Sequence, residues 1–174
     1  GGSSIRGNID MLAGIREYIR RSRQTYVVLS LGNNIYNMDL SAAVDYHINN
    51  QADITAVYKD FTGAEESLLS HYTLFDIDDE KHITDIEVQP YYPKTTYAGM
   101  DLYIMEKALL ESIVDVCSAR GDVDFVKDAV IKKMGGMRIF AYEHKGYCGK
   151  IDSIHSYYSN NMNFLNADIR RELF

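Results

Sequence analysis

The sequence has no tryptophan and only two cysteines, Cys117 and Cys148, among its 174 residues. The two cysteines form no CxxC pair and have no cluster of histidines beside them, which argues against a disulfide framework and against a zinc site. Cys117 lies in an apolar run, where a free cysteine behaves as a small hydrophobic residue. This cysteine usage is typical of a protein from a reducing compartment.

Positive charge is also scarce, because 18 lysines and arginines face 25 acidic residues and the net charge is -7. A nucleic-acid partner requires a basic face that neutralises phosphates, so nucleic acid is excluded as the main partner. The basic cluster Arg16, Arg20, Arg21 and Arg23 is interpreted as the solvated face and basic last turn of a helix.

Long apolar runs are missing as well. No run approaches the ~20 residues that span a bilayer, and no signal peptide precedes the first expected helix, so we expect a cytoplasmic protein without a membrane partner. Neither a GxGxxG loop nor a Walker A loop occurs, and no GxSxG nucleophile elbow is present. With 46% hydrophobic and 25% charged residues, the composition is that of one globular domain.

The first half of the chain alternates helical and strand patterns. Apolar residues at helical spacing predict a helix that ends near Ser22, and a continuous apolar run predicts a buried strand over 26–31. A second helix is expected over 40–50 and a second strand over 53–58. Strand, helix and strand with short connections are typical of a βαβ unit, so we expect parallel strands and a right-handed crossover here.

The second half predicts a hairpin followed by further helices and strands. The hairpin strands, 72–77 and 82–89, flank a charged turn, and Pro90 and Pro93 then interrupt regular structure. The later elements follow in order: strand 98–105, helices 107–119 and 124–134, strand 137–144, a short strand or turn over 146–151 and a helix over 153–165. The polar residues 166–174 are interpreted as a linker.

Few residues in this pattern could carry chemistry. Gly32, Asn33 and Asn34 follow the first strand, at the edge where ligands bind in open α/β sheets, although a plain turn has the same composition. An acidic run could bind a cation, but a solvated hairpin turn has the same appearance. The run comprises Asp76, Asp78, Asp79 and Glu80.

Histidines offer weaker candidates. His144 and Cys148 could form a nucleophilic Cys–His pair, although only their spacing supports it. His47 and His155, each on an expected helix, fit surface or satisfied core positions better than metal-ligand positions.

Seven short motifs occur in one order along nearly the whole chain. They are G-N-I-D-M-L at 7–12, Y-V-V-L-S-L-G-N-N-I-Y-N-M-D-L at 26–40, A-D-I-T at 52–55, I-E-V-Q-P at 86–90, A-G-M-D-L-Y at 98–103, D-F-V-K-D at 124–128, and G-Y at 146–147 followed by S-I, Tyr157 and N-M up to 162. In this order and spacing the chain resembles the nucleotidyltransferase domain of glucose-1-phosphate adenylyltransferase, also called ADP-glucose pyrophosphorylase.

The resemblance implies an α/β fold of the Rossmann-like (GT-A-like) nucleotidyltransferase type. The expected sheet is mixed, mostly parallel, flanked by helices and incomplete at its N-terminal side. Residues 1–165 would form the C-terminal larger part of that domain, and 166–174 would lead toward a left-handed β-helix domain. The family's N-terminal Gly-rich nucleotide loop has no counterpart in this sequence. The family makes ADP-glucose and pyrophosphate from ATP and glucose 1-phosphate, with magnesium held by two aspartates.

The metal and phosphate positions depart from the family's patterns. In G-D-H-I-Y-x-M-D, Gly32 is kept but Asn33 replaces the first metal aspartate. In G-Y-W-x-D-[IV]-G-T, Lys150 replaces the second metal aspartate. The pattern E-K-P reads V-Q-P, so Gln89 replaces a lysine that contacts the sugar phosphate.

Further departures concern the A-S-M-G pattern. Gly99 stands at its serine and Asp101 at its glycine, on either side of Met100, and Glu87 is another substrate-cleft position implied by the resemblance. No catalytic residue and no metal ligand is therefore assigned to this chain. Magnesium is expected only in a catalytic partner subunit.

These departures resemble the GlgD-type subunit of this enzyme, which accompanies a GlgC-type catalytic subunit. The first hypothesis is a regulatory or non-catalytic subunit of a hetero-oligomer in glycogen biosynthesis, without a cofactor of its own. The second is an active or weakly active nucleotidyltransferase in which Lys150 supplies part of the metal's charge. The third is a module that binds a sugar phosphate or nucleotide without reacting, with Glu87, Met100 and the backbone near Gly32 shaping a pocket.

Overall fold

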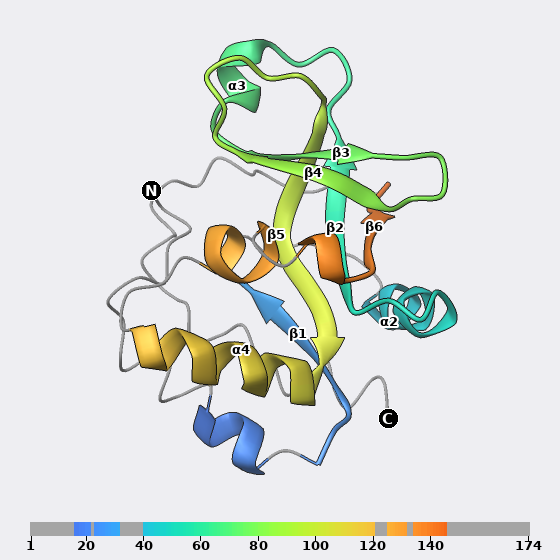
Figure 1. Ribbon diagram of the computed structural model, residues 1–174. Helices are drawn as coiled ribbons and strands as arrows, with labels where there is room; N and C mark the ends of the chain where they lie inside the picture. The colour runs from blue at the N-terminus through green and yellow to red at the C-terminus, as the bar shows by residue number, and fades with distance from the viewer. Residues whose placement is uncertain (1–15, 22, 32–39, 121–124, 132–133, 146–174) are drawn as a thin grey trace.

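A long strand, β5 (Tyr97–Glu106), organises the sheet of this protein. The computed structural model describes residues 16–21, 23–31, 40–120, 125–131 and 134–145. Within these residues, six strands form one sheet in the order β4-β3-β5-β2-β6, and β1 also pairs with β5 (Figure 1). Every other described strand therefore pairs either with β5 itself or with a strand that pairs with β5.

Both edges of β5 are occupied. β2 (Ile54–Asp60) runs antiparallel along one edge. The other edge is divided: β3 (Thr73–Ile77) meets it through Leu74 opposite Ala98, whereas β1 (Tyr26–Ser30) pairs with the last part of the strand. The apolar runs of β1, β2 and β5 are largely buried on both faces, which explains why their sequences show little alternation.

The sheet is mixed and flanked by helices, as predicted, but its described strands are mostly antiparallel. The prediction of a mostly parallel sheet is therefore wrong for this part of the chain. β6 (Ile139–Glu143) runs parallel to β2, whereas β1–β5, β2–β5, β3–β4 and β3–β5 are antiparallel pairs. β1 and β2 share a direction because both oppose β5, but β5 lies between them. An apolar run predicts burial on both faces and does not reveal which later strand enters between two earlier ones.

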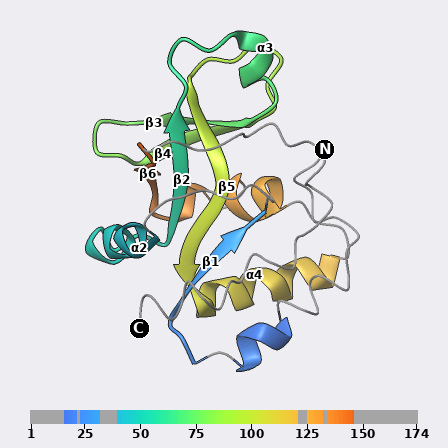
Figure 2. The ribbon, with the colours of Figure 1, turned by 180° about the vertical axis from the view of Figure 1, so that it is seen from behind.

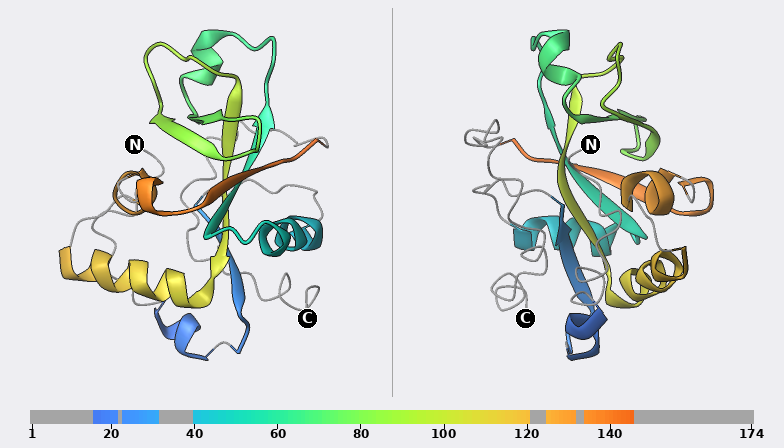
Figure 3. Two further views of the ribbon diagram at one scale, coloured as in Figure 1. Left: turned by 45° about the vertical axis from the view of Figure 1, so that its right-hand side comes forward. Right: turned by 90° about the vertical axis from the view of Figure 1, so that its left-hand side faces the viewer.

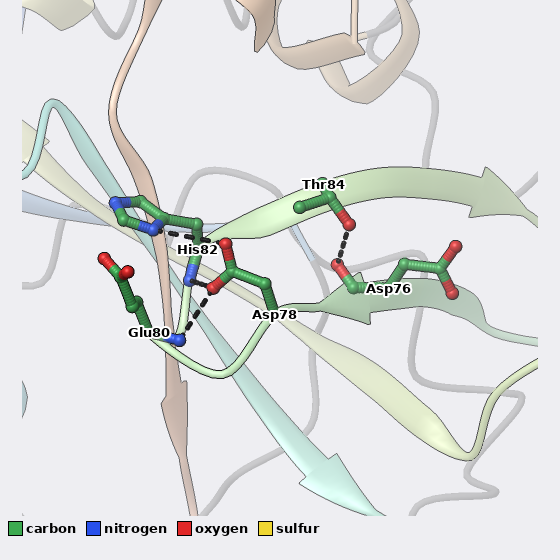
Figure 4. Close-up of polar contacts among 5 residues, drawn as sticks. All are labelled: Asp76, Asp78, Glu80, His82 and Thr84. Carbon is green, nitrogen blue, oxygen red and sulfur yellow. Dashed lines mark hydrogen bonds and ion pairs between the residues drawn. The ribbon is translucent and has the colours of Figure 1, made fainter.

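The predicted hairpin is confirmed as β3 and β4 (Ile83–Val88), and one aspartate organises its turn. Asp78 Oδ1 accepts hydrogen bonds from the backbone N–H groups of Glu80 at 2.9 Å and His82 at 2.8 Å (Figure 4). Lys81 then reverses the chain with a φ of 73°. A side chain that satisfies two turn N–H groups stabilises a tight reversal, as aspartate commonly does in turns.

The tip of the hairpin reaches the far edge of the sheet. The N–H of Ala141 on β6 donates a hydrogen bond to the Lys81 carbonyl at 2.8 Å. The rings of His82 and Phe140 lie 4.4 Å apart between centroids. The hairpin thus connects β4 and β6, which stand at opposite ends of the strand order.

Helices cover both faces of the sheet (Figure 3). α2 (Leu40–Asn49) packs on one face, against an apolar layer that includes Val57. The other face is covered by α4 (Lys107–Arg120), by the helical residues 16–21 and by a π-helical segment, η1 (Phe125–Ile131). Seen from behind, α2 and α4 lie on opposite sides of β5 (Figure 2). The described chain is therefore a layered α/β domain.

Two helical segments differ from the sequence prediction. The helix predicted over 124–134 is π-helical where the structure describes it, and a 3-10 turn, η2 (Met134–Gly136), comes shortly afterwards. A one-turn helix, α3 (Glu66–Leu69), has no counterpart in the prediction, because four residues are too few to show a helical apolar period. Leu69 packs with Leu74 and Ala98 in a small apolar cluster at the start of β5.

The basic cluster lies on a helix and next to it, as interpreted from the sequence. Arg16 pairs with Asp115 of α4 at 2.8 Å, and Arg20 and Arg21 pair with Glu17 at 2.7 and 2.8 Å. These side chains are largely solvent-exposed, so the pairs contribute little to stability.

β5 changes its backbone conformation at Asp101. The φ of Asp101 is 57°, in the left-handed region that few residues other than glycine, asparagine and aspartate enter. Its carbonyl accepts a hydrogen bond from the N–H of Leu31, just beyond β1, at 2.8 Å. On the opposite edge, the register with β2 shifts between Ala56 and Tyr58. The irregularity therefore lies where the edge partner of β5 changes from β3 to β1.

A polar pair is buried beneath α2. His47 is 1% exposed, and its Nδ1 lies 2.7 Å from Oγ1 of Thr55 on β2, while the ring of Tyr26 packs edge-on at 5.6 Å. Burial lowers the pKa of His47 from 6.5 to about 4, and the charge of Asp53 opposes this shift in part. His47 is thus a neutral core residue at neutral pH, as interpreted from the sequence, but only its Nδ1 is hydrogen-bonded and its buried Nε2 has no partner.

The first prediction concerns the pH dependence of stability. Because the folded-state pKa of His47 is lowered from 6.5 to about 4, the unfolded chain takes up a proton in this window that the folded chain does not. The free energy of unfolding should therefore fall as pH decreases from about 6.5 to about 4, by roughly 2–3 kcal/mol from this residue. Urea denaturation followed by circular dichroism at several pH values measures this slope.

The matched control is His47→Gln, which keeps a hydrogen-bonding group for Thr55 but does not titrate. Its unfolding free energy should lose correspondingly less between about pH 7 and about pH 4.5 than that of the unmodified protein. Equal pH dependence in the two proteins would show that His47 does not carry the effect.

The second prediction concerns the conformational strain of the left-handed backbone at Asp101. Asp101→Gly and Asp101→Ala both remove the carboxylate and its contacts, and they differ only in the Cβ that a left-handed residue tolerates poorly. We expect the glycine variant to be the more stable of the two by about 1 kcal/mol in urea denaturation. At Thr84, which lies within β4, the order should reverse, with alanine more stable than glycine. If the same variant, glycine or alanine, were the more stable at both positions, the left-handed conformation of Asp101 would not be the cause.

Candidate functional site

The end of β1 and the middle of β5 meet at the candidate cleft. Leu31 is 7% exposed, and its backbone N–H donates a hydrogen bond to the Asp101 carbonyl at 2.8 Å. Gly32 and Asn33 follow Leu31 directly in the sequence. The last described residue before this segment is therefore bonded to β5, whereas Gly32 and Asn33 themselves lie outside the described residues and their position stays a prediction.

Some predicted cleft residues lie outside the part of the chain that the structure describes. These are Gly32, Asn33 and Lys150. Asn34, Cys148 and His155, from the weaker hypotheses, also lie outside it. The described site therefore consists of positions on β4 and β5.

The end of β4 is tied to the start of β5 through β3. Glu87 is paired with Leu74, which is in turn paired with Ala98. Gln89 is exposed, adopts a left-handed φ of 49°, and donates its N–H to the Tyr72 carbonyl at 3.0 Å. The structure thus places Glu87 and Gln89 one strand away from the A-G-M-D segment.

Gly99 and Met100 do not line one surface. Successive residues of a strand point to opposite faces. Met100 is 5% exposed and packs in the apolar layer with Ala43 and Val44 of α2, so its side chain is part of the core. The resemblance implies a cleft position for Met100, and the structure assigns its side chain a packing role.

The ring of Phe75 occupies the space in front of Gly99. A Cβ built on Gly99 would lie 2.8 Å from Cζ of Phe75, which is too short for a real carbon contact, and 3.2 Å from its Cε2, which is unusually tight. Phe75 is 1% exposed and belongs to the main apolar cluster, so its ring has little room to retreat. The buried ring of Phe75 thus lies where the resemblance implies a serine side chain.

Next to Gly99 lies Tyr58, a buried tyrosine whose phenol is a weaker acid than usual. Tyr58 is paired with Gly99 across β2 and β5 and is 2% exposed. Burial, followed by the nearby charge of Glu143, raises the pKa of Tyr58 well above its usual range. The phenol is therefore protonated at neutral pH and offers no anionic ligand for a cation.

The acidic run 76–80 forms a solvated hairpin turn. Asp78, which organises this turn, is exposed, and backbone hydrogen bonding from His82 is the main cause that holds its pKa below the usual range (Figure 4). The backbone carbonyl of Asp76 accepts a hydrogen bond from the Thr84 hydroxyl at 3.3 Å. Among the described residues, no three or more His, Cys, Asp or Glu side chains are grouped so that they could hold a metal ion. The solvated-turn alternative is the one that the structure supports.

Asp60, at the end of β2, anchors the segment that leads into β5. Burial would raise the pKa of Asp60, but hydrogen bonds from the hydroxyls of Thr96 and Thr62 outweigh it, and the pKa is held below its usual range. Asp60 Oδ1 accepts from both hydroxyls at 2.7 Å. This carboxylate fixes the segment that enters β5.

His144 is a buried histidine at the end of β6. It is 6% exposed, and its backbone N–H donates a hydrogen bond to the Tyr58 carbonyl at 2.8 Å. The ring nitrogen Nε2 has no hydrogen-bond partner. The Cys–His pair stays untested because Cys148 is outside the described residues.

Two features were missed from the sequence. The position of Phe75 in front of Gly99 depends on strand register, for which the sequence carries no local signal. The adjacent tyrosines Tyr91 and Tyr92 are 86% and 76% exposed, and two aromatic residues between Pro90 and Pro93 were a visible signal for them.

The sequence pattern of the family described as nucleotidyl transferase matches residues 3–165 of this chain. The chain is also similar to proteins named glucose-1-phosphate adenylyltransferase. That of Lachnospira eligens is 31% identical over 150 residues, which are 86% of this chain and 35% of the relative. That of Halalkalibacterium halodurans is 30% identical over 168 residues, which are 95% of this chain and 43% of the relative.

The curated relatives are longer than this chain. A third, from Bacillus cytotoxicus, is 28% identical over 151 residues, 85% of this chain and 39% of its own length. The chain thus spans about two fifths of the length of the relatives that it matches. In the part of the chain that the structure describes, no helix is both long enough and apolar enough to cross a membrane.

The family match and the fold agree. The matched residues cover almost the entire sequence, and the described part folds as a mixed sheet between layers of helices. The chain belongs to the nucleotidyl transferase family.

Proposed function

We propose that this chain belongs to a non-catalytic, regulatory or stabilising subunit of a glucose-1-phosphate adenylyltransferase, acting beside a GlgC-type catalytic subunit. The family membership and the roughly 30% identity to glucose-1-phosphate adenylyltransferases support the enzyme class. The observation that carries the non-catalytic role is the pair Asn33 and Lys150, which stand where the family's pattern has two metal-binding aspartates.

The donor set at these two positions does not fit magnesium. Magnesium prefers anionic oxygen ligands, and the amide of Asn33 is a weaker ligand than a carboxylate. A lysine ammonium about 4 Å from a divalent ion is repelled by roughly 8 kcal/mol at an effective dielectric constant of 20. Replacing attraction by a repulsion of this size removes the driving force for holding the ion, so no metal-dependent step is assigned to this chain.

The described cleft supports the same proposal through packing. Gln89 carries no positive charge with which to bind a sugar phosphate, and its backbone is engaged with Tyr72. At Gly99 the serine hydroxyl of the family's pattern is absent, and the ring of Phe75 fills its place. The loss therefore extends beyond the charges to the shape of the site.

The third prediction is an activity measurement on the protein at its full natural length. Formation of ADP-glucose from ATP and glucose 1-phosphate should be at background level, with and without magnesium. Addition of a GlgC-type subunit should give a complex that co-purifies and whose activity differs from that of the catalytic subunit alone. Robust magnesium-dependent turnover by the protein alone would refute the proposal.

The variant Lys150→Ala separates the main alternative. If the chain is an active transferase in which Lys150 replaces part of the metal's charge, this variant should lower turnover steeply relative to the unmodified protein. If no turnover exists to be lowered, the non-catalytic role stands. Lys81→Ala, at an exposed lysine in the turn between β3 and β4 and outside the implied cleft positions, is the matched control for loss of one positive charge.

The fourth prediction tests the repacking of the cleft. Gly99→Ser restores the family's residue but places a Cβ against Phe75, so it should lower the free energy of unfolding by about 1–3 kcal/mol. In a Phe75→Leu background the same substitution should cost clearly less, because the smaller side chain vacates the space. Urea denaturation of the four proteins of this double-mutant cycle measures the difference. Equal cost in both backgrounds would mean that Phe75 is not the obstacle.

A further inference from the structure

The segment between β4 and β5 presents two tyrosines to solvent. Tyr91 is 86% and Tyr92 is 76% exposed, whereas the other exposed large hydrophobic residues of the described chain reach at most 44%. Their rings lie 5.3 Å apart between centroids and are tilted by 58°, so each ring supports the other and keeps a free face. Two neighbouring aromatic residues left this open require a functional explanation.

The segment holds the tyrosine pair in place. Pro90 and Pro93, which restrict backbone torsions, flank the two residues and are the only prolines of the sequence. Gln89 anchors the start of the segment through its N–H bond to Tyr72 at 3.0 Å. At the end of the segment, the hydroxyl of Thr95 donates to the Phe75 carbonyl at 2.9 Å. A ligand that binds here therefore meets a surface that is largely ordered in advance, which reduces the entropic cost of binding.

The size of the exposed patch decides between classes of partner. Two tyrosines offer roughly 300 Å² of side-chain surface, whereas one side of a stable protein interface buries about 800 Å². The segment lies at the end of the molecule that carries α3, away from α2 and α4 (Figures 1 and 3). The exposed Ile48 and Val116, on α2 and α4, therefore do not extend the patch, and Leu68 on α3, which is 44% exposed at the same end, adds only part of one side chain to it.

The chemistry of the patch matches a sugar. A pyranose ring has an apolar face of C–H groups that stacks on an aromatic ring, and its rim of hydroxyls seeks hydrogen-bonding groups. Around the tyrosines the segment supplies their own hydroxyls, the exposed amide of Gln89 and the exposed ammonium of Lys94. With one lysine in this segment and a net charge of -7 for the whole chain, a polyanionic ligand or a membrane surface is disfavoured.

We propose that Tyr91 and Tyr92 form a carbohydrate-binding platform for an oligosaccharide of pyranose units. The tilt of 58° between the rings suits a curved chain, such as an α-1,4-linked glucan, better than a flat ribbon, because a flat ribbon needs coplanar rings. The platform adjoins Gln89, one of the implied cleft positions, but its stacking surface consists of Tyr91 and Tyr92, which are not among those positions, so the proposal does not depend on whether the cleft is active.

The fifth prediction is tested by isothermal titration calorimetry of the whole protein with maltoheptaose and with cellohexaose. Maltoheptaose should bind, and cellohexaose should bind at least several-fold more weakly. Tyr91→Ala and Tyr92→Ala should each weaken maltoheptaose binding by roughly tenfold, and the double variant should abolish it. Tyr91→Phe and Tyr92→Phe keep the stacking faces and should stay within a few-fold of the unmodified protein.

Ile48→Ala, which removes an exposed apolar side chain from α2, is the control and should leave maltoheptaose binding unchanged. Circular dichroism checks that the double variant is folded. Absence of binding to both sugars, or unchanged binding by the double variant, would overturn the proposal. So would a change in oligomeric state as the only effect of the double variant, because the tyrosines would then be a protein contact. The adenylyltransferase assay is independent, so failure of either proposal can be distinguished from failure of the other.

Discussion

Backbone pairing along both edges of β5 is the interaction on which the described structure depends. One edge carries β2 throughout, and the other passes from β3 to β1. A strand that changes partners along one edge must adjust its backbone, and Asp101 makes that adjustment in a left-handed conformation while accepting the N–H of Leu31. The same few residues define where β1 ends against β5, so the described candidate positions on β5 are placed directly by the sheet.

Because the sheet depends on this pairing, the fold does not require particular chemical groups at the proposed cleft. The sheet is held by main-chain hydrogen bonds and by two apolar layers, which include Met100 on one face and Phe75 on the other. Neither layer requires the charged groups of a transferase site. Under the proposed function, residues such as Gln89 and Gly99 would change what the cleft can bind without disturbing these layers. At Gly99 the packing also makes reversal costly, because the neighbouring ring occupies the vacated space.

Much of the element order could be predicted from residue patterns. The buried strands follow apolar runs, and the hairpin follows from the charged turn that Asp78 organises. The direction of pairing could not be predicted, because β5 enters between β1 and β2 from more than 30 residues further along the chain. The contact of Phe75 with Gly99 depends on the same register and was equally hidden. The order of the weak motifs did reveal the family, since several short matches in sequence carry more information than any one of them.

The position of β5 also has a consequence for synthesis of the protein on the ribosome. β1 and β2 leave the exit tunnel well before β5, the strand with which both pair in the described structure. At a translation rate of about 5–20 residues per second, their apolar segments wait for roughly several seconds without their central partner. A nascent chain of this topology thus exposes apolar strand segments co-translationally, and shielding of these segments until β5 emerges would lower their risk of aggregation.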